Sequence, residues 1–322
     1  MNVTRRKKLV RIGGGSSGYT ILRGLKEYPF DITAVVNMFD SGGSSGVLRD
    51  ELGILPPGDV RRALAALAEG ERVEILRELF NYRFKSNGSV SGHNFGNLFI
   101  AALSDIYGSD ARAIEKASVA LGISGRVLPV STDLAHIHAV LSDGTEIEGE
   151  TNIDIPQHDG SLLIQKVFLK PQPYLFAGAA AAIRDADIIV IGPGDLYTSI
   201  MPNLLVAGMR DALRESNAIK VVVTNLMTKW GETHGYTASD MVREVLAYSG
   251  LLKFDYALCN TSVPSTQLLA QYAEQKQFPM VCDDAVSQYA SYVVRGDFAS
   301  ESEVVRHDSH KLARAVANVV VP

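Results

Sequence analysis

Apolar and polar residues alternate along the chain with two periods, which predict strands and helices in turn. The segments at 7–12, 19–28 and 31–39 have the patterns of a strand, an amphipathic helix and a buried strand. A right-handed crossover between two such strands makes them parallel. The N-terminal region is therefore predicted to form a βαβ unit.

The same alternation returns after residue 174. Strand patterns lie at 186–192, 218–227 and 254–260, and helical patterns lie at 203–216, 237–250, 265–275 and from about residue 308. Because strands and helices alternate at both ends of the chain, both ends are expected to contribute to one parallel sheet.

The middle of the chain has a different pattern. Two helices separated by Gly70 are predicted between residues 58 and 83, and two more at 94–107 and 110–121. The alternation around Ser142–Gly144 then indicates a hairpin. We predict a single α/β domain with a Rossmann-like, doubly wound, mainly parallel sheet; the sheet core spans about 8–83 and 174–322, and a helical and β-hairpin segment is inserted at about 84–173.

Composition narrows the class of protein. The chain has 322 residues, of which 46% are hydrophobic, so it can bury a large core without disulfides. Its formal net charge is −5, which provides no global basic field to attract nucleic acid. We interpret the basic run at 5–8 as solvent-exposed residues at the start of the first strand, and not as a binding patch.

Cysteine usage and the apolar stretches favour a cytoplasmic protein. Cys259 and Cys282 are far apart in the sequence and lack the spacing of metal ligands, so neither a disulfide framework nor a zinc site is expected. The N-terminal residues lack the apolar core of a signal peptide. Charged residues interrupt the most apolar stretch, at 174–192, so we expect a helix and a buried strand there and no membrane insertion.

The first candidate site is the glycine-rich turn after the first strand. Gly13, Gly15 and Gly18 form a GxGxxG pattern, and Asp40 lies near the end of the second strand. Glycines let the backbone approach a diphosphate, whose charge meets free N–H groups at the helix start. Close packing of the helix on the sheet is the alternative reason for the glycines. The predicted ligand contacts are Gly13, Gly14, Gly15, Ser16, Ser17 and Gly18.

A second hydroxyl-rich glycine run, at 41–46, follows the second strand. Two such cradles at adjacent strand ends predict one ligand that spans both, with anionic oxygens bound by amides, hydroxyls and the guanidinium of Arg49. A surface linker is the alternative, since glycine and serine are also linker residues. The predicted contacts are Asn37, Asp40, Ser41, Gly42, Gly43, Ser44, Ser45 and Arg49.

Asp59 and Arg61 lie at the start of the next predicted helix. Asp59 could be only the helix N-cap. Alternatively, Asp40 and Asp59 follow turns that converge on one sheet edge, where together they could hold Mg²⁺ against a diphosphate.

Three further polar clusters follow predicted strands or begin a predicted helix. The carboxyl ends of parallel strands share one edge, which is where α/β proteins bind ligands. The predicted contacts in these clusters are His93, Asn94 and Asn97; Gly192, Pro193, Gly194, Asp195, Tyr197 and Thr198; and Asn225, Thr228, Glu232 and Thr233.

Five segments resemble one known family in the order in which that family has them. They are GGGSSGYTILRGLK, ITAVVNMFDSGGSSGVLRDELGILPPGDVRRALAALA, GHNFGNLFIAAL, IGPGDLYTSIMPNLLVAGM and VVVTNLMTKWGETHGYTASD. Together they look like the YvcK-type gluconeogenesis factors of the CofD-like superfamily. The chain departs from the usual motifs at Ser16–Tyr19, where the family has TGLS, at Ser41 in place of a second acid, at Val47 in place of an arginine, and at Asp195 in place of a serine.

The resemblance implies a Rossmann-like cytosolic protein. Regulatory members of the family bind uridine-diphosphate amino sugars and influence carbon metabolism, cell shape and wall synthesis. The related enzymes, of the 2-phospho-L-lactate transferase type, transfer phospholactate from a guanosine-diphosphate-linked donor to a deazaflavin with Mg²⁺. Both branches would share glycine turns that hold a diphosphate.

The sequence is compatible with three functions. The favoured one is a cytoplasmic regulator that binds a nucleotide-diphosphate ligand, a UDP-sugar by resemblance, and it needs no catalytic residue. A Mg²⁺-dependent CofD-like transferase is the alternative, and the missing second acid at Ser41 weakens it. An NAD(P)-binding oxidoreductase explains GxGxxG and Asp40 but not the other clusters. The sequence leaves open whether the ligand is a UDP-sugar, GDP or NAD, and a homodimer is expected only by class.

Overall fold

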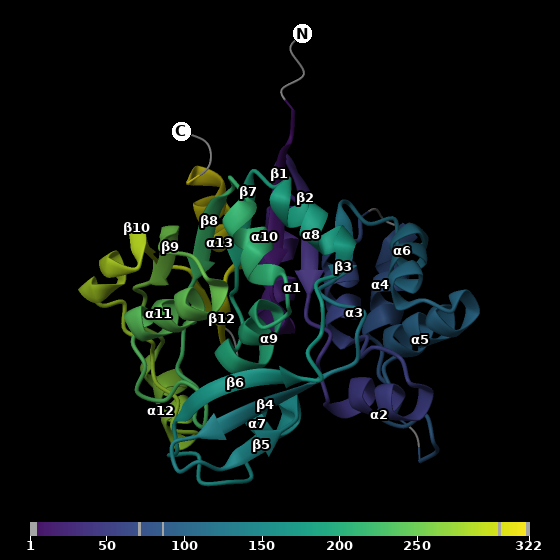
Figure 1. Cartoon of the computed structure of the whole chain (residues 1–322), viewed down its shortest axis with the longest axis horizontal. Coiled ribbons are helices and arrows are strands. Elements are labelled where there is room, and N and C mark those ends of the chain that lie inside the picture. Colours follow the sequence, from purple (N-terminus) through teal and green to yellow (C-terminus); the bar gives the residue numbers. More distant parts are fainter. Residues whose placement is uncertain (1–4, 70–71, 86, 302–303, 320–322) are drawn as a thin grey trace.

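The computed structural model describes residues 5–69, 72–85, 87–301 and 304–319. A seven-stranded sheet runs through the molecule in the order β10-β9-β8-β7-β1-β2-β3, and every pairing of its described strands is parallel (Figure 1). Its strands are β1 (Lys7–Ile12), β2 (Phe30–Val36), β3 (Arg126–Pro129), β7 (Ile188–Ile191), β8 (Ile219–Val223), β9 (Phe254–Asn260) and β10 (Ala290–Gly296). The predicted doubly wound α/β fold is therefore confirmed.

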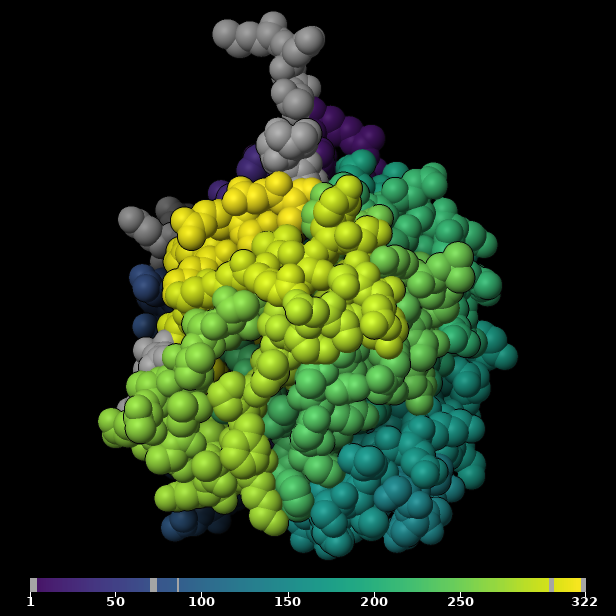
Figure 2. Space-filling model, turned by 90° about the vertical axis from the view of Figure 1, so that its left-hand side faces the viewer, coloured from purple at the N-terminus to yellow at the C-terminus, as the bar shows by residue number. Residues whose placement is uncertain are grey.

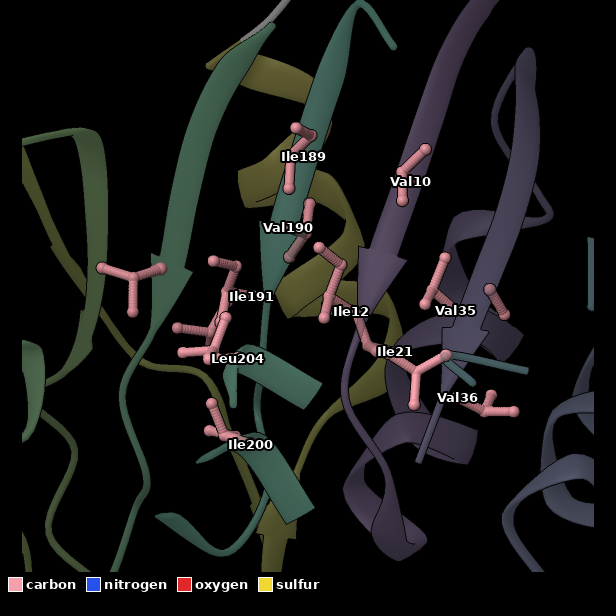
Figure 3. Close-up of a cluster of buried hydrophobic side chains, with 14 of the residues drawn as sticks. Val10, Ile12, Ile21, Val35, Val36, Ile189, Val190, Ile191, Ile200 and Leu204 are labelled. Atoms are coloured by element: carbon pink, nitrogen blue, oxygen red, sulfur yellow. The ribbon is translucent and has the colours of Figure 1, made fainter. Parts of the chain in front are cut away.

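The middle strands are apolar on both faces because helices cover both faces. In register, Leu9 of β1 lies opposite Ile32 of β2 and Ile188 of β7. Figure 3 shows the apolar side chains of these three strands side by side, with Ile21 and Leu204 from the flanking helices. Full burial on both faces is what the near-continuous apolar runs of these strands require.

Helices pack on the sheet in two groups. In one group α1 (Gly15–Leu25) contacts α3 (Gly58–Leu67) and α13 (Ser309–Asn318). In the other, α10 (Met209–Glu215) contacts α8 (Ala177–Arg184), α9 (Met201–Leu204) and α11 (Ala238–Ser249). In the space-filling view the C-terminal segment, in yellow, lies on the surface next to the preceding yellow-green segments (Figure 2).

The predicted hairpin is confirmed. β4 (His136–Leu141) pairs antiparallel with β5 (Glu146–Glu148), and β6 (Ile164–Lys170) completes a three-stranded sheet. A short helix, α7 (Glu150–Asp154), follows β5. Figure 1 shows this unit below the carboxyl ends of the central strands.

The remaining elements lie around these units. They are α2 (Gly43–Leu52), α4 (Arg72–Asn81), α5 (Phe95–Tyr107), α6 (Asp110–Ala120), a π-helical turn at Leu196–Ile200, α12 (Thr266–Glu274), a 3-10 turn at Asp284–Gln288, β11 (Ala299–Glu301) and β12 (Val305–His307). None of the described helices is both long and apolar enough to cross a membrane.

The structure differs from the sequence predictions at four places. Both glycine runs were expected as loops, but helices α1 and α2 begin within them at Gly15 and Gly43. Asp59 is not the N-cap of α3; Pro57 is, and Asp59 lies in the first helical turn. The predicted helix at 203–216 is interrupted before Gly208, which has a φ of +92°.

The fourth difference concerns the segment expected as an insertion. β3 lies within residues 84–173 but pairs with β2 at the edge of the central sheet. The predicted helix break at Gly70 lies outside the described residues. Both cysteines are free thiols.

Candidate functional site

The polar turns after β1, β2 and β7 meet at one edge of the sheet, where they line two adjoining cavities. Cavity 1 has a volume of about 400 Å³ and lies between the starts of α1, α2 and α3 and the helix α7. Cavity 2 has a volume of about 270 Å³ and lies between α1, the turn after β8, and the C-terminal elements α12 and β12. Ser16 and Asp195 line both, so the cavities meet at the start of α1.

Many predicted site residues line these cavities. Those in cavity 1 are Gly15, Ser16, Asn37, Asp40, Gly42, Gly43, Ser44, Ser45, Asp59, Arg61, Asn97, Asp195 and Thr198. Those in cavity 2 are Ser16, Ser17, Asp195, Asn225 and Thr228. The convergence expected from the parallel topology is thus present in the structure.

The other predicted residues do not line these two cavities, although some of them contact residues that do. His93 contacts Ser44, with 3.2 Å between Nδ1 and Oγ, and Asn94 caps α5 by accepting from the amide of Asn97. Tyr197 is 1% exposed, and its hydroxyl lies 2.9 Å from that of Tyr236. The full set outside the two linings is Gly13, Gly14, Gly18, Ser41, Arg49, His93, Asn94, Gly192, Pro193, Gly194, Tyr197, Glu232 and Thr233.

Asp59 ties the first glycine turn to α3. One oxygen of its carboxylate accepts from the amide of Gly15 at 2.9 Å and from Arg62 at 2.6 Å. A Cβ at Gly14 would lie 2.0 Å from the other oxygen, so only glycine fits there. The first free amide of α1 is therefore already satisfied by a protein carboxylate, unlike in a dinucleotide-binding turn, where a phosphate takes this place.

Asp40 and Glu150 form an acidic pair on one side of cavity 1. A Cβ built on Gly42 would lie 3.4 Å from Asp40 Oδ1 and 3.7 Å from Glu150 Oε2, so both carboxylates border this glycine. Burial, and then the charge of Asp59, raise the pKa of Asp40. Burial, and then the charge of Asp40, raise the pKa of Glu150 to about 8, so the pair retains a proton at neutral pH.

This pair fits a magnesium ion better than the predicted pair of Asp40 and Asp59. Carboxylate oxygens are the protein ligands that Mg²⁺ prefers. Asp59 already accepts two hydrogen bonds, whereas Glu150 supplies a second carboxylate beside Asp40 from a segment 110 residues away from Ser41. The backbone around Ser41 is fixed by Thr151, whose amide donates to the serine hydroxyl at 3.0 Å.

Arginines provide the opposite charge in cavity 1. Arg61, Arg62 and Arg83 line it, and Arg61 is only 9% exposed. Burial lowers the pKa of Arg61 to about 10, which leaves it charged at neutral pH. Its Nη1 donates to Asn81 at 2.8 Å, while its buried Nε has no hydrogen-bond partner among the described residues. Cavity 1 can therefore receive an anionic group as well as a cation.

Lys229 lies at the boundary between the cavities with three carboxylates around its ammonium group. Nζ is 2.7 Å from Glu232 and 3.2 Å from Asp195, and it also contacts Asp154 of α7. Burial alone would lower the pKa of Lys229, but the three carboxylates outweigh burial and raise it. Glu232 is 1% exposed, and burial raises its pKa to about 7 although Lys229 acts in the opposite direction.

The three acids come close enough to hold a metal ion, with ligand oxygens within 4.8 Å of one another. The ammonium group of Lys229 lies among them and supplies the cation instead. It also connects the hairpin unit to the turns after β7 and β8.

Cavity 2 has a different chemical character. Tyr272 and Arg306 line it together with His307, which is 7% exposed. Burial lowers the pKa of His307 to about 4, so its ring is neutral at physiological pH. The Tyr272 hydroxyl accepts from the amide of Val305 at 3.0 Å, which joins α12 to β12.

Sequence reasoning missed several lining residues. Glu150 and Asp154 belong to the segment read as an insertion, and Tyr272 and Arg306 lie on C-terminal elements without glycine motifs. Lys229 lies within the last predicted cluster, directly after Thr228, which is the local signal that could have identified it.

A family model described as 2-phospho-L-lactate transferase CofD matches residues 9–299. The chain belongs to the CofD family. A protein from Halalkalibacterium halodurans named gluconeogenesis factor is 40% identical over 97% of this chain and 96% of its own length. One of the same name from Bacillus subtilis is 37% identical over 98% of this chain and 99% of its own length.

A solved structure supports the fold assignment within the CofD family. The crystal structure of protein BH3568 from Bacillus halodurans has a TM-score of 0.92 and 40% sequence identity, and the match covers 97% of this chain and 100% of that one. The YvcK-type resemblance is therefore confirmed at the level of family and fold. Membership in the CofD family supports a regulatory or CofD-like role.

Proposed function

We propose that the protein is a cytoplasmic regulator that binds a nucleotide-diphosphate ligand, a UDP-sugar, at the carboxyl edge of the sheet. The supporting observation is the pair of cavities that meet at Ser16, with volumes of about 400 and 270 Å³. Two joined compartments suit an elongated ligand with a charged group in its middle. Through this ligand the protein would influence central carbon metabolism, cell shape or wall synthesis.

Each part of such a ligand meets suitable groups. The diphosphate lies at the start of α1, near Ser16 and Ser17, where helix amides favour an anion. The base and ribose occupy cavity 2, where Tyr272 offers an aromatic face and Arg306 a cation. The sugar occupies cavity 1, where carboxylates and Asn97 can bind hydroxyl groups.

A Mg²⁺-dependent CofD-like transferase is the second candidate. It is favoured by Glu150, which places a second carboxylate beside Asp40 although Ser41 replaces an acid in the sequence. In that case Mg²⁺ would neutralise charge on the diphosphate donor. Because Asp59 occupies the Gly15 amide, a diphosphate at the start of α1, whether from NAD(P) or from a UDP-sugar, must bind the amides that follow it.

Thermal-shift measurements distinguish these functions. UDP-sugars, GDP, NAD and NADP are each tested with and without Mg²⁺, since a ligand that binds the folded state raises the melting temperature. The regulator predicts a shift with UDP-sugars that does not require Mg²⁺. A Mg²⁺-dependent shift with GDP, lost in Asp40→Asn but kept in Asp31→Asn at the exposed other end of β2, would favour the transferase. No shift with any nucleotide would refute both.

A further inference from the structure

Arg11 is a buried cation in β1, an inner strand of the sheet. Its side chain is 1% exposed, and among the described residues it forms hydrogen bonds but no ion pair. Nη2 donates to the carbonyls of Pro193 at 2.8 Å and Gly14 at 3.2 Å, and Nε donates to Gly192 at 3.4 Å. One guanidinium thus joins the turn after β1 to the turn after β7.

Two glycines of the GxGxxG pattern make room for this guanidinium. A Cβ at Gly18 would lie 2.5 Å from Nη1, and a Cβ at Gly13 would lie 3.0 Å from Nη2. The third glycine, Gly15, faces Ser199, with 2.9 Å between its notional Cβ and the serine hydroxyl. The pattern is therefore explained by contacts inside the protein, and the guanidinium lies against the first turn of α1.

The guanidinium keeps its charge in this environment. Burial lowers the pKa of Arg11 to about 10, while Asp59 acts in the opposite direction, so the group is protonated at neutral pH. A charge with little surrounding water is weakly screened, and its field extends farther than that of an exposed arginine. Arg62 is compensated by Asp59 and Lys229 by three carboxylates, whereas Arg61 and Arg83 line cavity 1 and add to the positive charge there.

A second observation marks the same place as an anion site. Thr198 is 2% exposed and lines cavity 1, yet its hydroxyl has no hydrogen-bond partner among the described residues. The carbonyl oxygen of its neighbour Ser199 accepts from the amide of Gly14 at 3.0 Å, so Thr198 adjoins a residue that contacts the turn held by Arg11. The buried hydroxyl of Thr198 is a donor without an acceptor, and the α1 amides that follow Gly15, whose own amide is bound by Asp59, can donate to the same anion.

We propose that Arg11 is the fixed cation of an anion site at the start of α1, which receives a phosphate of the nucleotide-diphosphate ligand. It acts from beneath the two turns as a positioning residue and does not touch the ligand. This inference rests on the proposed function and specifies how a site between the two cavities attracts the diphosphate.

The test compares UDP with uridine, which has the same base and ribose but no phosphate, by calorimetric titration. Arg11→Ile combined with Gly18→Leu removes the charge and refills the space that Gly18 leaves. Arg11→Gln removes the charge and keeps a donor, and Arg11→Lys keeps the charge. Circular dichroism and melting temperature establish which variants fold.

We expect both charge-free variants to bind UDP at least about tenfold more weakly than the wild type, with uridine binding unchanged and Arg11→Lys close to the wild type. Unchanged UDP affinity in a folded charge-free variant would overturn the role of Arg11 but leave the proposed function intact. An equal loss of UDP and uridine would show that Arg11 only shapes the turns. A wild type that binds no UDP would refute both proposals.

Discussion

Lys229 holds three carboxylates at the boundary between the cavities, so replacing it tests how this boundary is stabilised. Lys229→Met keeps the aliphatic stem and leaves Glu232, which is 1% exposed, beside Asp154 and Asp195 without a cation. Removing one partner of a buried ion pair costs about 3–5 kcal/mol. Asp154 and Asp195 are 31% and 46% exposed, so water screens their interaction with Lys229. We therefore expect the substitution to lower the free energy of unfolding by about 2–4 kcal/mol at pH 8.

The loss should depend on pH because Glu232 can take up a proton. Its pKa in the folded protein is about 7, above the ordinary value of 4.5, so folding binds this proton and stability falls as pH rises from 4.5 to 7. Without Lys229 this pKa rises further and the fall extends to higher pH. At pH 5.5 the glutamic acid is neutral, and the cost of the substitution should drop to about 1 kcal/mol.

Urea unfolding at pH 5.5 and pH 8 measures both values. Lys253→Met, at an exposed position, controls for the substitution itself. Lys229→Met combined with Glu232→Gln removes both charges and should recover most of the loss at pH 8. A cost that is equal at the two pH values, or that adds to the effect of Glu232→Gln, would show that Lys229 does not stabilise the protein through the charge of Glu232.

Three further predictions concern the walls of the cavities. Gly14→Ala places a Cβ 2.0 Å from Asp59 and should lower the melting temperature and abolish UDP-sugar binding, whereas Gly88→Ala, with nothing within 4 Å, should change neither. Glu150→Gln should stabilise the protein by about 1–3 kcal/mol at pH 9. Because the pKa of the buried wild-type carboxyl is about 8, the wild-type protein becomes less stable as pH rises from 4.5 to 8, and the glutamine variant does not. Equal urea midpoints of the two proteins at pH 9 would contradict this. Arg306→Gln should weaken UDP-sugar binding about tenfold in calorimetry without changing the melting temperature, unlike the exposed Arg314→Gln, which should affect neither.

The sheet could be predicted from the sequence because its strands carry their own signals. The apolar runs at β2 and β7 are near-continuous since both faces are buried, and turns that contain glycine follow β1, β2 and β7. The edge strand β3 could not be assigned, because its four residues follow two helices and precede a hairpin.

The chemistry of the site was harder to predict because it depends on distant contacts. Lys229 and Asp154 lie 75 positions apart, and no local pattern links them. The GxGxxG pattern predicts either a phosphate cradle or close packing of the helix on the sheet, and in the structure Gly13 and Gly18 accommodate the side chain of Arg11. A pattern of glycines shows that something approaches the backbone closely, but only the fold shows what.

The glycine runs were misread as loops for a related reason. In both runs a helix begins among the glycines and serines, at Gly15 and Gly43, because small residues allow its first turn to pack closely against the opposing turns. A Cβ at Gly46, for example, would lie 2.1 Å from the carbonyl oxygen of Ser41.

A crystal structure with a bound UDP-sugar would show directly whether the ligand occupies both cavities. We expect the diphosphate to lie at the junction of the two cavities, against Ser16 and Ser17, with the base beside Tyr272 and the sugar beside Asp40. A UDP-sugar bound at another surface, with the start of α1 free of ligand, would contradict it.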